Sequence, residues 1–447
     1  MSALVWFRSD LRITDNRTLH TAHTQHQTLH AVFHDTPAQW KLHGDAPIRI
    51  DFIRRSVERL AEALAVGGVT LHIIRSDRFD AAPDLLAKLA DTLGATELYF
   101  GAEHAVNERR RDAAVAQRFH AVGLKTHCIT DATLFKPGTL RTGTGGNYRV
   151  FTPFKKRLLA TLTAEQTRTV PAPWSLPEQT PSHDPWPAGE QEAQRRLAAF
   201  SKHHIAAYHE HRDLPALPGT SQLSPYLVNG LISPRQCLAA ARRIPGPGSN
   251  TWISELIWRE FYRHVLVAFP RVSRGKAFQP DTEAVQWRNN PAQFHAWCTG
   301  QTGIPIVDAA MRQLLTEGWM HNRLRMVTAQ FLSKNLLIDW RWGERFFMEH
   351  LIDGDLANNN GGWQWSASTG TDAAPYFRVF NPTSQSRRFD ADGVFIRRYV
   401  PELAGVTGRS IHDPAPLTRA SCGYPLPIVD LKSSRQQAID AFKALRS

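Results

Sequence analysis

Short apolar runs alternate with amphipathic stretches along the first 128 residues. Runs at 3–8, 29–33, 69–74, 97–100 and 125–128 are typical of strands that are buried on both faces. Between them, three stretches with helical spacing end at glycines, at about 47–66, 82–93 and 107–121. This alternation predicts a doubly wound, Rossmann-like parallel sheet, in which ligands usually bind beyond the carboxyl ends of the strands.

The pattern changes after residue 128. Residues 131–192 contain Gly-Thr-Gly-Gly at 143–146 and a proline-rich run at 171–187, which we interpret as a long linker. The glycine-rich piece lacks the spacing of a dinucleotide fingerprint and favours a flexible loop. Helical periods then dominate, at 191–207, 234–243, 252–269, 306–316, 322–337, 342–351 and 434–445. We predict an α/β domain over 1–130, a linker over 131–192 and an all-α domain over 193–447.

Composition narrows the function classes. The net charge of +12 fits either a polyanionic partner or a merely basic soluble protein. The absence of a run of eighteen apolar residues predicts no membrane span, and the first ten residues do not resemble a signal peptide. The four cysteines lack CxxC spacing, which argues against a zinc site or a disulfide scaffold and favours a reducing cytoplasm.

Residues 353–365 combine two carboxylates, three adjacent asparagines, a Gly-Gly pair and two tryptophans. Carboxylates and amides are rarely buried without partners, and two exposed indoles would be costly in water. One interpretation is the wall of a pocket for a flat ligand with polar edges. The alternative is a surface loop that its tryptophans anchor.

Two further stretches place polar groups among apolar ones. On the predicted helix 252–269, Trp252, Glu255, Arg259 and Tyr262 lie near one stripe, with Trp258 three residues from Glu255. At 320–326, Asn322, Arg323 and Met326 share a helical face, and Arg325 points elsewhere and could pair with an acid such as Asp353. A Glu–Arg pair on an ordinary helix surface and a solvated basic turn remain the simpler alternatives.

The combined motifs carry a resemblance. Residues 6–16 (Trp-Phe-Arg-Ser-Asp-Leu-Arg-Ile-Thr-Asp-Asn), 255–262 (Glu-Leu-Ile-Trp-Arg-Glu-Phe-Tyr), 303–311 and 353–365 resemble the DNA photolyase/cryptochrome family. Within it they are most similar to bacterial class I cyclobutane pyrimidine dimer photolyases. The resemblance implies a carbon–carbon lyase in which excited reduced FAD gives an electron to a pyrimidine dimer in DNA, the ring opens and the electron returns.

The resemblance also implies roles for individual residues. FAD phosphates and ribitol would contact Tyr208, Thr220, Ser221 and Ser224. The flavin would be surrounded by Trp252, Arg259, Asn322, Arg325, Asp353, Asp355 and Asn359, with Asn359 facing flavin N5. Photolyases are among the enzymes that flip their target out of the duplex. Trp258 and Trp365 would be the walls of the dimer slot, Glu255 and Asn322 would bond the pyrimidine edges and Met326 would pack on the dimer. The flanking phosphates would meet Arg212, Arg323 and Arg378.

Two further sets follow from the same resemblance. Trp363, Trp340 and Trp287 would form a tryptophan chain that photoreduces the flavin. His43, Asn107, Glu108 and Arg274 match positions that hold an antenna. The arginine at 274, where a relative has lysine, keeps a basic residue and favours 5,10-methenyltetrahydrofolate over a deazaflavin.

Two rival functions belong to the same family. A signalling cryptochrome commonly has a long C-terminal tail, whereas this sequence ends about forty residues after its last family motif. A (6-4) photolyase has histidines where this chain has Asn322 and Met326. The leading expectation is therefore dimer repair by a monomer without an obligate protein or membrane partner, in the cytoplasm and on the nucleoid when bound to DNA.

Overall fold

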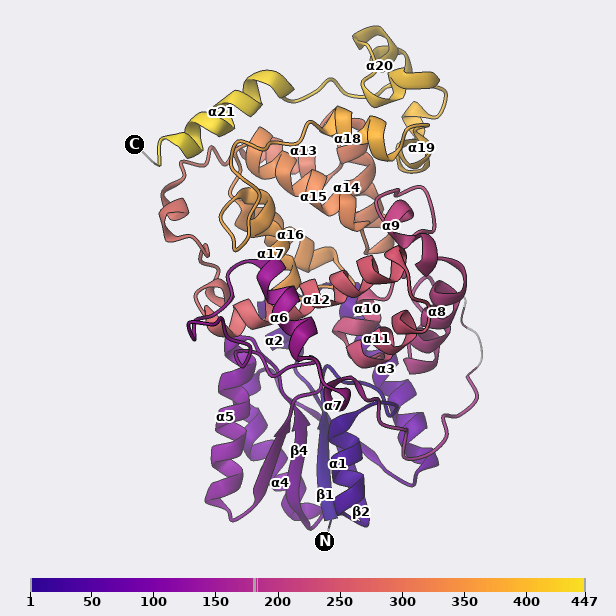
Figure 1. Ribbon diagram of the computed structural model, residues 1–447, viewed down its shortest axis with the longest axis vertical. Coiled ribbons are helices and arrows are strands. Elements are labelled where there is room, and N and C mark those ends of the chain that lie inside the picture. The colour runs from indigo at the N-terminus through magenta and orange to yellow at the C-terminus, as the bar shows by residue number, and fades with distance from the viewer. Residues whose placement is uncertain (1, 180–181, 183, 446–447) are drawn as a thin grey trace. The chain divides into compact units, whose positions relative to one another are not determined.

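The chain folds as two compact units in a computed structural model that describes residues 2–179, 182 and 184–445 (Figure 1). The first unit comprises Met1–Ala206 and Ser221–Pro270, and the second comprises Ala207–Thr220 and Arg271–Ser447. The predicted domains, 1–130 and 193–447, divide the chain differently and stay a prediction.

The first unit is built on a five-stranded parallel sheet of order β3-β2-β1-β4-β5. Its strands are β1 (Ser2–Phe7), β2 (Thr28–Asp35), β3 (Leu71–Arg75), β4 (Ala95–Gly101) and β5 (Lys125–Ile129). The predicted parallel sheet is thus confirmed. Its central strand is buried from Ala3 to Phe7, because helices cover both faces. The strand order reverses between β1 and β4, where such sheets bind ligands.

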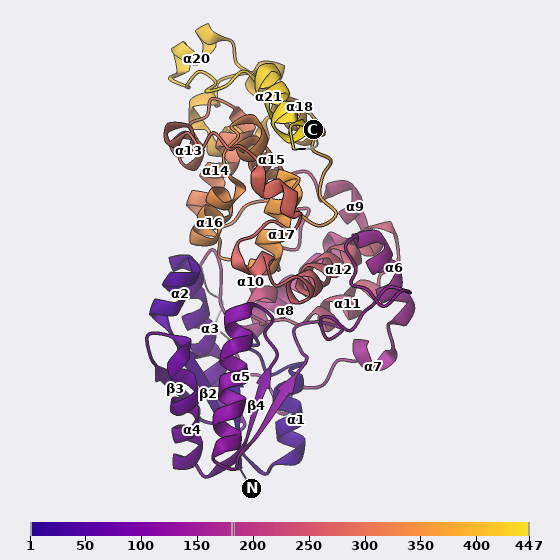
Figure 2. The ribbon, with the colours of Figure 1, turned by 90° about the vertical axis from the view of Figure 1, so that its left-hand side faces the viewer.

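Five helices accompany the sheet: α1 (Arg17–Gln25), α2 (Pro37–His43), α3 (Pro47–Val66), α4 (Ala82–Thr92) and α5 (Val106–Ala121). Figure 2 shows α1 on one side of the sheet and α4 and α5 on the other. Sequence patterns predict α3, α4 and α5 but miss α1 and α2. Helix α1 is rich in Thr and His and buries only Thr18, Leu19 and Ala22, so too few apolar residues mark its buried face.

The segment interpreted as a linker contains two helices that its sequence pattern did not predict, α6 (Phe151–Thr161) and α7 (Ala164–Thr167). Helix α6 buries Phe151, Phe154 and Leu158, which recur at helical spacing. The apolar period covers only three positions, and basic residues between them dominate the local composition, so the helix is hard to recognise from the sequence.

The remainder of the described chain is helical, as predicted. The helices are α8 (Glu190–His203), α9 (Tyr208–His211), α10 (Ser224–Val228), α11 (Pro234–Arg242), α12 (Pro247–Ala268), α13 (Pro291–Cys298), α14 (Pro305–Glu317), α15 (Asn322–Gln330), α16 (Trp340–His350), α17 (Leu356–Ala367), α18 (Pro382–Phe389), α19 (Val394–Tyr399), α20 (Pro416–Cys422) and α21 (Leu431–Lys443). The single helix predicted over 322–337 is α15 followed by a π-helical turn, Phe331–Asn335. Residues 353–365, which could have been a surface loop, lie mostly in α17.

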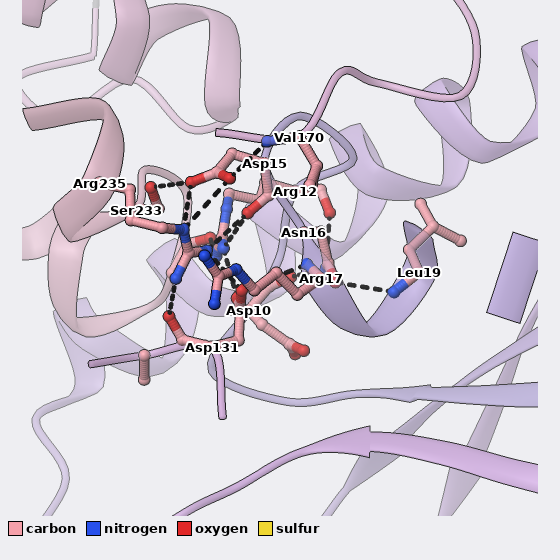
Figure 3. A network of polar contacts seen from close by, with 12 residues as sticks. Asp10, Arg12, Asp15, Asn16, Arg17, Leu19, Asp131, Val170, Ser233 and Arg235 are labelled. Atoms are coloured by element: carbon pink, nitrogen blue, oxygen red, sulfur yellow. Dashed lines mark hydrogen bonds and ion pairs between the residues drawn. The ribbon is translucent and has the colours of Figure 1, made fainter. Parts of the chain in front are cut away.

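The motif at 6–16 forms part of a buried clamp inside the first unit (Figure 3). Arg235 of α11 donates to Asp131 at 2.5 Å and to Asp15 at 2.9 Å. Arg12 donates to the second carboxylate oxygen of Asp131. The four residues are 0–2% exposed, and removing one partner of such a pair leaves an uncompensated buried charge. This part of the motif therefore joins the sheet to α11 instead of carrying chemistry.

Candidate functional site

Helix α12 brings one group of predicted site residues together in the first unit. Trp252 is 4% exposed and packs against Phe200 at a centroid distance of 5.0 Å. Arg259 donates to the carbonyl oxygens of Ala132, at 2.8 Å, and Leu227, at 3.1 Å. These bonds fix α12 against α10 and the segment that follows β5. Glu255 lies on the same helix and remains partly exposed.

Trp258 has one face covered by the chain itself. The ring of Phe151 is stacked on the indole with centroids 3.7 Å apart and planes 6° apart. Tyr262, one turn along α12, lies at 5.5 Å. Because Phe151 occupies one face, only the other face of this partly exposed indole can receive the ring of a ligand.

The four residues expected near the FAD phosphates are divided between the units. Ser221 and Ser224 belong to the first, where Ser221 Oγ accepts from the backbone N–H of Leu223 at 3.4 Å and Ser224 begins α10. Tyr208 and Thr220 belong to the second. Tyr208 is 8% exposed, and the guanidinium of Arg212 lies 5.6 Å from its ring centre.

In the second unit, α17 carries a dense polar network. Asp355 caps the helix by accepting from the N–H of Ala357 at 3.1 Å. The amide nitrogens of Asn359 and Asn360 donate to Glu344 of α16, to its backbone oxygen at 2.9 Å and to its carboxylate at 2.8 Å. Burial raises the pKa of Glu344 to about 7. Glu344 has no distinguishing pattern in the sequence, because only its place beside α17 sets it apart from other glutamates.

Helix α15 presents Asn322 and Met326 four residues apart on one face, Asn322 exposed and Met326 partly buried. Arg325 pairs with Asp353 as the sequence suggested. Arg323 donates to Asp213 at 2.9 and 3.2 Å, so a DNA phosphate would have to share this guanidinium with a carboxylate.

The segment after α17 exposes an aromatic residue that the sequence analysis did not single out. Phe377 is 56% exposed and adjoins Arg378, which is also exposed. Trp365 is partly buried, with its ring edge-on to Phe380 at 6.5 Å. An apolar residue beside an arginine in an irregular segment has no periodic signature, so only its exposure identifies Phe377.

All three residues of the expected tryptophan chain belong to the second unit. Trp340 and Trp363 are 1% and 2% exposed and share one hydrophobic core, against which the partly buried Trp287 packs. Gly343 permits close approach of α16 to α17, since a Cβ there would lie 2.1 Å from Trp363. Trp297, which the sequence analysis did not select, lies 6.0 Å from Trp363.

Three of the four expected antenna residues meet in the first unit. Nδ2 of Asn107 lies 3.0 Å from Nε2 of His43, and Nδ1 of His43 lies 3.7 Å from a carboxylate oxygen of Glu108. Burial raises the pKa of Glu108. The fourth residue, Arg274, belongs to the second unit.

Comparisons with known proteins identify the family. The sequence profile described as DNA photolyase matches residues 3–174, and the profile described as FAD binding domain of DNA photolyase matches 252–444. The protein of Escherichia coli (strain K12) named deoxyribodipyrimidine photo-lyase is 42% identical over an alignment of 467 residues, which covers 99% of this chain and 98% of that protein. This chain belongs to the DNA photolyase family. The predicted family and its FAD-binding domain are therefore confirmed.

Solved structures of the photolyase family share this fold. A class III photolyase from Agrobacterium tumefaciens is 34% identical with a TM-score of 0.86, and the match covers 100% of this chain and 98% of that one. A cryptochrome from Synechocystis sp. PCC6803 is 28% identical with a TM-score of 0.88, over 98% and 99% of the two chains. Because both match so well, the fold alone does not separate photolyases from cryptochromes. Among the described residues, no helix has the length and apolarity to cross a membrane.

Proposed function

We propose that this protein is a deoxyribodipyrimidine photo-lyase, which uses light to split cyclobutane pyrimidine dimers in DNA. The observation that carries the proposal is the near full-length similarity to the E. coli protein of that name. The site residues agree with it: Glu255 and Trp258 lie one turn apart on α12, and Asn322 and Met326 share a face of α15.

The match to the FAD-binding profile implies bound FAD, and residues of each unit carry polar groups that suit it. Tyr208, Thr220, Ser221 and Ser224 would bind its phosphates and ribitol, and Trp252, Arg259, Asn322, Arg325, Asp353, Asp355 and Asn359 would surround the flavin. The side-chain nitrogen of Asn359 is held by a backbone carbonyl, so its oxygen faces the opposite way and can accept a hydrogen bond from flavin N5–H. Reduced FAD held by these residues would supply the electron for ring opening and would recover it afterwards.

The chain's own residues bind and orient the flipped dimer. Trp258 and Trp365 supply flat apolar walls, and Met326 packs on the saturated ring. Glu255 and Asn322 hydrogen-bond the pyrimidine edges, where Glu255 stabilises the transient negative charge on the dimer. The phosphates on either side of the lesion are bound by Arg212, Arg323 and Arg378.

Two accessory sets complete the proposal. Trp363, Trp340 and Trp287 would supply oxidisable indoles through which bound oxidised FAD could be reduced under light. His43, Asn107, Glu108 and Arg274 hold 5,10-methenyltetrahydrofolate as an antenna, and the near-ultraviolet absorption of purified protein tests this. We further propose that the enzyme acts as a monomer in the cytoplasm, without an obligate protein partner.

Repair of a defined lesion tests the function directly. The reduced protein is mixed with an oligonucleotide that carries one thymine dimer and is illuminated with blue or near-ultraviolet light. We expect the two thymines to be restored without strand cleavage, and no repair in the dark. Repair of a (6-4) lesion in place of the dimer, or light absorption without any repair, would instead favour a (6-4) photolyase or a signalling cryptochrome.

A further inference from the structure

The segment between the sheet and the helical part of the first unit has an unusual charge pattern. Residues 132–164 contain no aspartate or glutamate. They contain six basic residues, which are Lys136, Arg141, Arg149, Lys155, Lys156 and Arg157. In an ordinary solvated surface both signs are interspersed, and an uninterrupted run of one sign repels itself unless a polyanion is bound.

Most of these side chains lie on the surface. Five are exposed, and we call them the linker cations: Lys136, Arg141, Arg149, Lys156 and Arg157. The sixth, Lys155, turns inward and donates from Nζ to Ser254 of α12 at 2.6 Å. Lys155 therefore attaches the segment to α12, and the guanidinium of Arg149 lies 5.5 Å from the ring centre of Phe269, while all five linker cations remain exposed.

Helix α6 also brings two of the linker cations close to Trp258, the proposed wall of the dimer slot on α12. Its first residue, Phe151, is the ring stacked at 3.7 Å on the back of Trp258, and Phe154 packs on Phe261 of α12 at 5.2 Å. Figures 1 and 2 both show α6 beside α12. The linker cations thus belong to the same unit as Trp258, on the segment whose Phe151 covers one face of this indole.

We infer that the linker cations are a second DNA-binding surface, which contacts backbone phosphates of duplex DNA outside the lesion. This inference rests on the proposed function, because it takes DNA as the substrate. Helix α6 is about 16 Å long at 1.5 Å per residue, and B-DNA carries one charge per about 1.7 Å of axis, so several phosphates can lie along it. Phosphate contacts set affinity and register but carry no base information. The surface would therefore raise affinity for damaged and intact duplex equally.

The salt dependence of binding tests this inference. We compare the wild type with the double variant Lys156→Gln/Arg157→Gln, using a duplex with one thymine dimer and the same duplex without it. Loss of two phosphate contacts should make the slope of log K against log salt shallower by about 1.8 and weaken both affinities roughly 10- to 60-fold at 0.1 M salt. The ratio of damaged to intact affinity should not change.

A matched control uses Arg242→Gln/Arg243→Gln, a second adjacent pair of exposed arginines in the same unit, at the end of α11. This variant removes the same charge and should keep the wild-type slope. Equal slopes for all three proteins would overturn the inference, because the linker cations would then make no phosphate contacts. Equal losses in both variants would also overturn it, because only the total charge of the protein would then matter. If the wild type does not prefer the damaged duplex, the proposed function is wrong. The salt slopes measured on intact duplex then still decide whether the linker cations bind DNA.

Discussion

Nη2 of Arg325 lies 3.0 and 2.8 Å from the two carboxylate oxygens of Asp353. Nε of the same guanidinium donates to the carbonyl oxygen of Met320 at 2.8 Å. The ion pair therefore joins the first turns of α15 to the short segment before α17. Because Asp353 is only 7% exposed, removal of Arg325 would leave a buried carboxylate without its ion-pair partner.

Asp353→Asn should weaken FAD binding by about tenfold or more, because hydrogen bonds to charged groups contribute roughly 1.5–3 kcal/mol. The ratio of visible flavin absorbance to protein absorbance after dialysis measures the loss. Asp339→Asn, which disrupts the pair with Arg341 elsewhere in the same unit, is the control and should retain flavin. Full flavin retention by Asp353→Asn would remove this residue from the proposed site.

Trp258→Ala should selectively weaken binding to dimer-containing DNA. Stacking of a base on an aromatic side chain contributes roughly 1–3 kcal/mol, which corresponds to a loss of about 5- to 150-fold. Fluorescence anisotropy with damaged and intact duplexes gives both affinities. Trp342→Ala removes a partly buried indole outside the slot and should leave the preference unchanged. Equal losses on both duplexes for Trp258→Ala would argue against a dimer slot at this indole.

Sequence reasoning predicted the sheet well because buried parallel strands are short apolar runs with clear ends. The observed β4, Ala95–Gly101, surrounds the predicted 97–100. Helix α17 was not predicted as a helix, because its residues are polar and aromatic on every side and form no apolar stripe. Such a composition points to a ligand-binding site more clearly than to a helix.

The site was predicted unevenly for a similar reason. The sequence named Asp353 as one possible acidic partner of Arg325, and the structure forms this pair. The contact of His43 with Asn107 is consistent with a family motif. Glu344 and Phe151 were missed, because a burial-shifted carboxyl and a ring behind a tryptophan are properties of tertiary packing. No local pattern encodes either one.

The raised pKa of Glu344 predicts a pH dependence of stability. Its carboxyl has a pKa of about 7 in the folded chain and an ordinary value of 4.5. Between these values the folded chain holds a proton that the unfolded chain has released, so stability falls as pH rises from about 4.5 to about 7. The contribution is at most about 3–4 kcal/mol, since the pKa rises by about 2.5 and each pKa unit corresponds to about 1.36 kcal/mol.

Thermal unfolding at pH 5, 6, 7 and 8 measures this contribution. Glu344→Gln cannot ionise and can still accept from Asn360, so the midpoint of the variant should fall less than that of the wild type over this range. Glu349→Gln changes an exposed residue of the same helix and should follow the wild type. Parallel curves for wild type and Glu344→Gln would show that folding does not raise the pKa of Glu344.

Trp287→Phe should separate photoreduction from repair. Phenylalanine keeps an aromatic ring beside Phe442, which lies 6.0 Å from Trp287, so α21 should remain packed. It removes the easily oxidised indole, and light-driven reduction of oxidised flavin in the presence of an external donor should become inefficient. The chemically reduced variant should still repair dimers, because the repair electron passes between flavin and substrate. Trp319→Phe, at a buried indole that contacts His321, should photoreduce normally. If the Trp287→Phe variant photoreduces at the wild-type rate, Trp287 is not the terminal donor. If the chemically reduced variant cannot repair dimers, Trp287 has a role in substrate binding or folding.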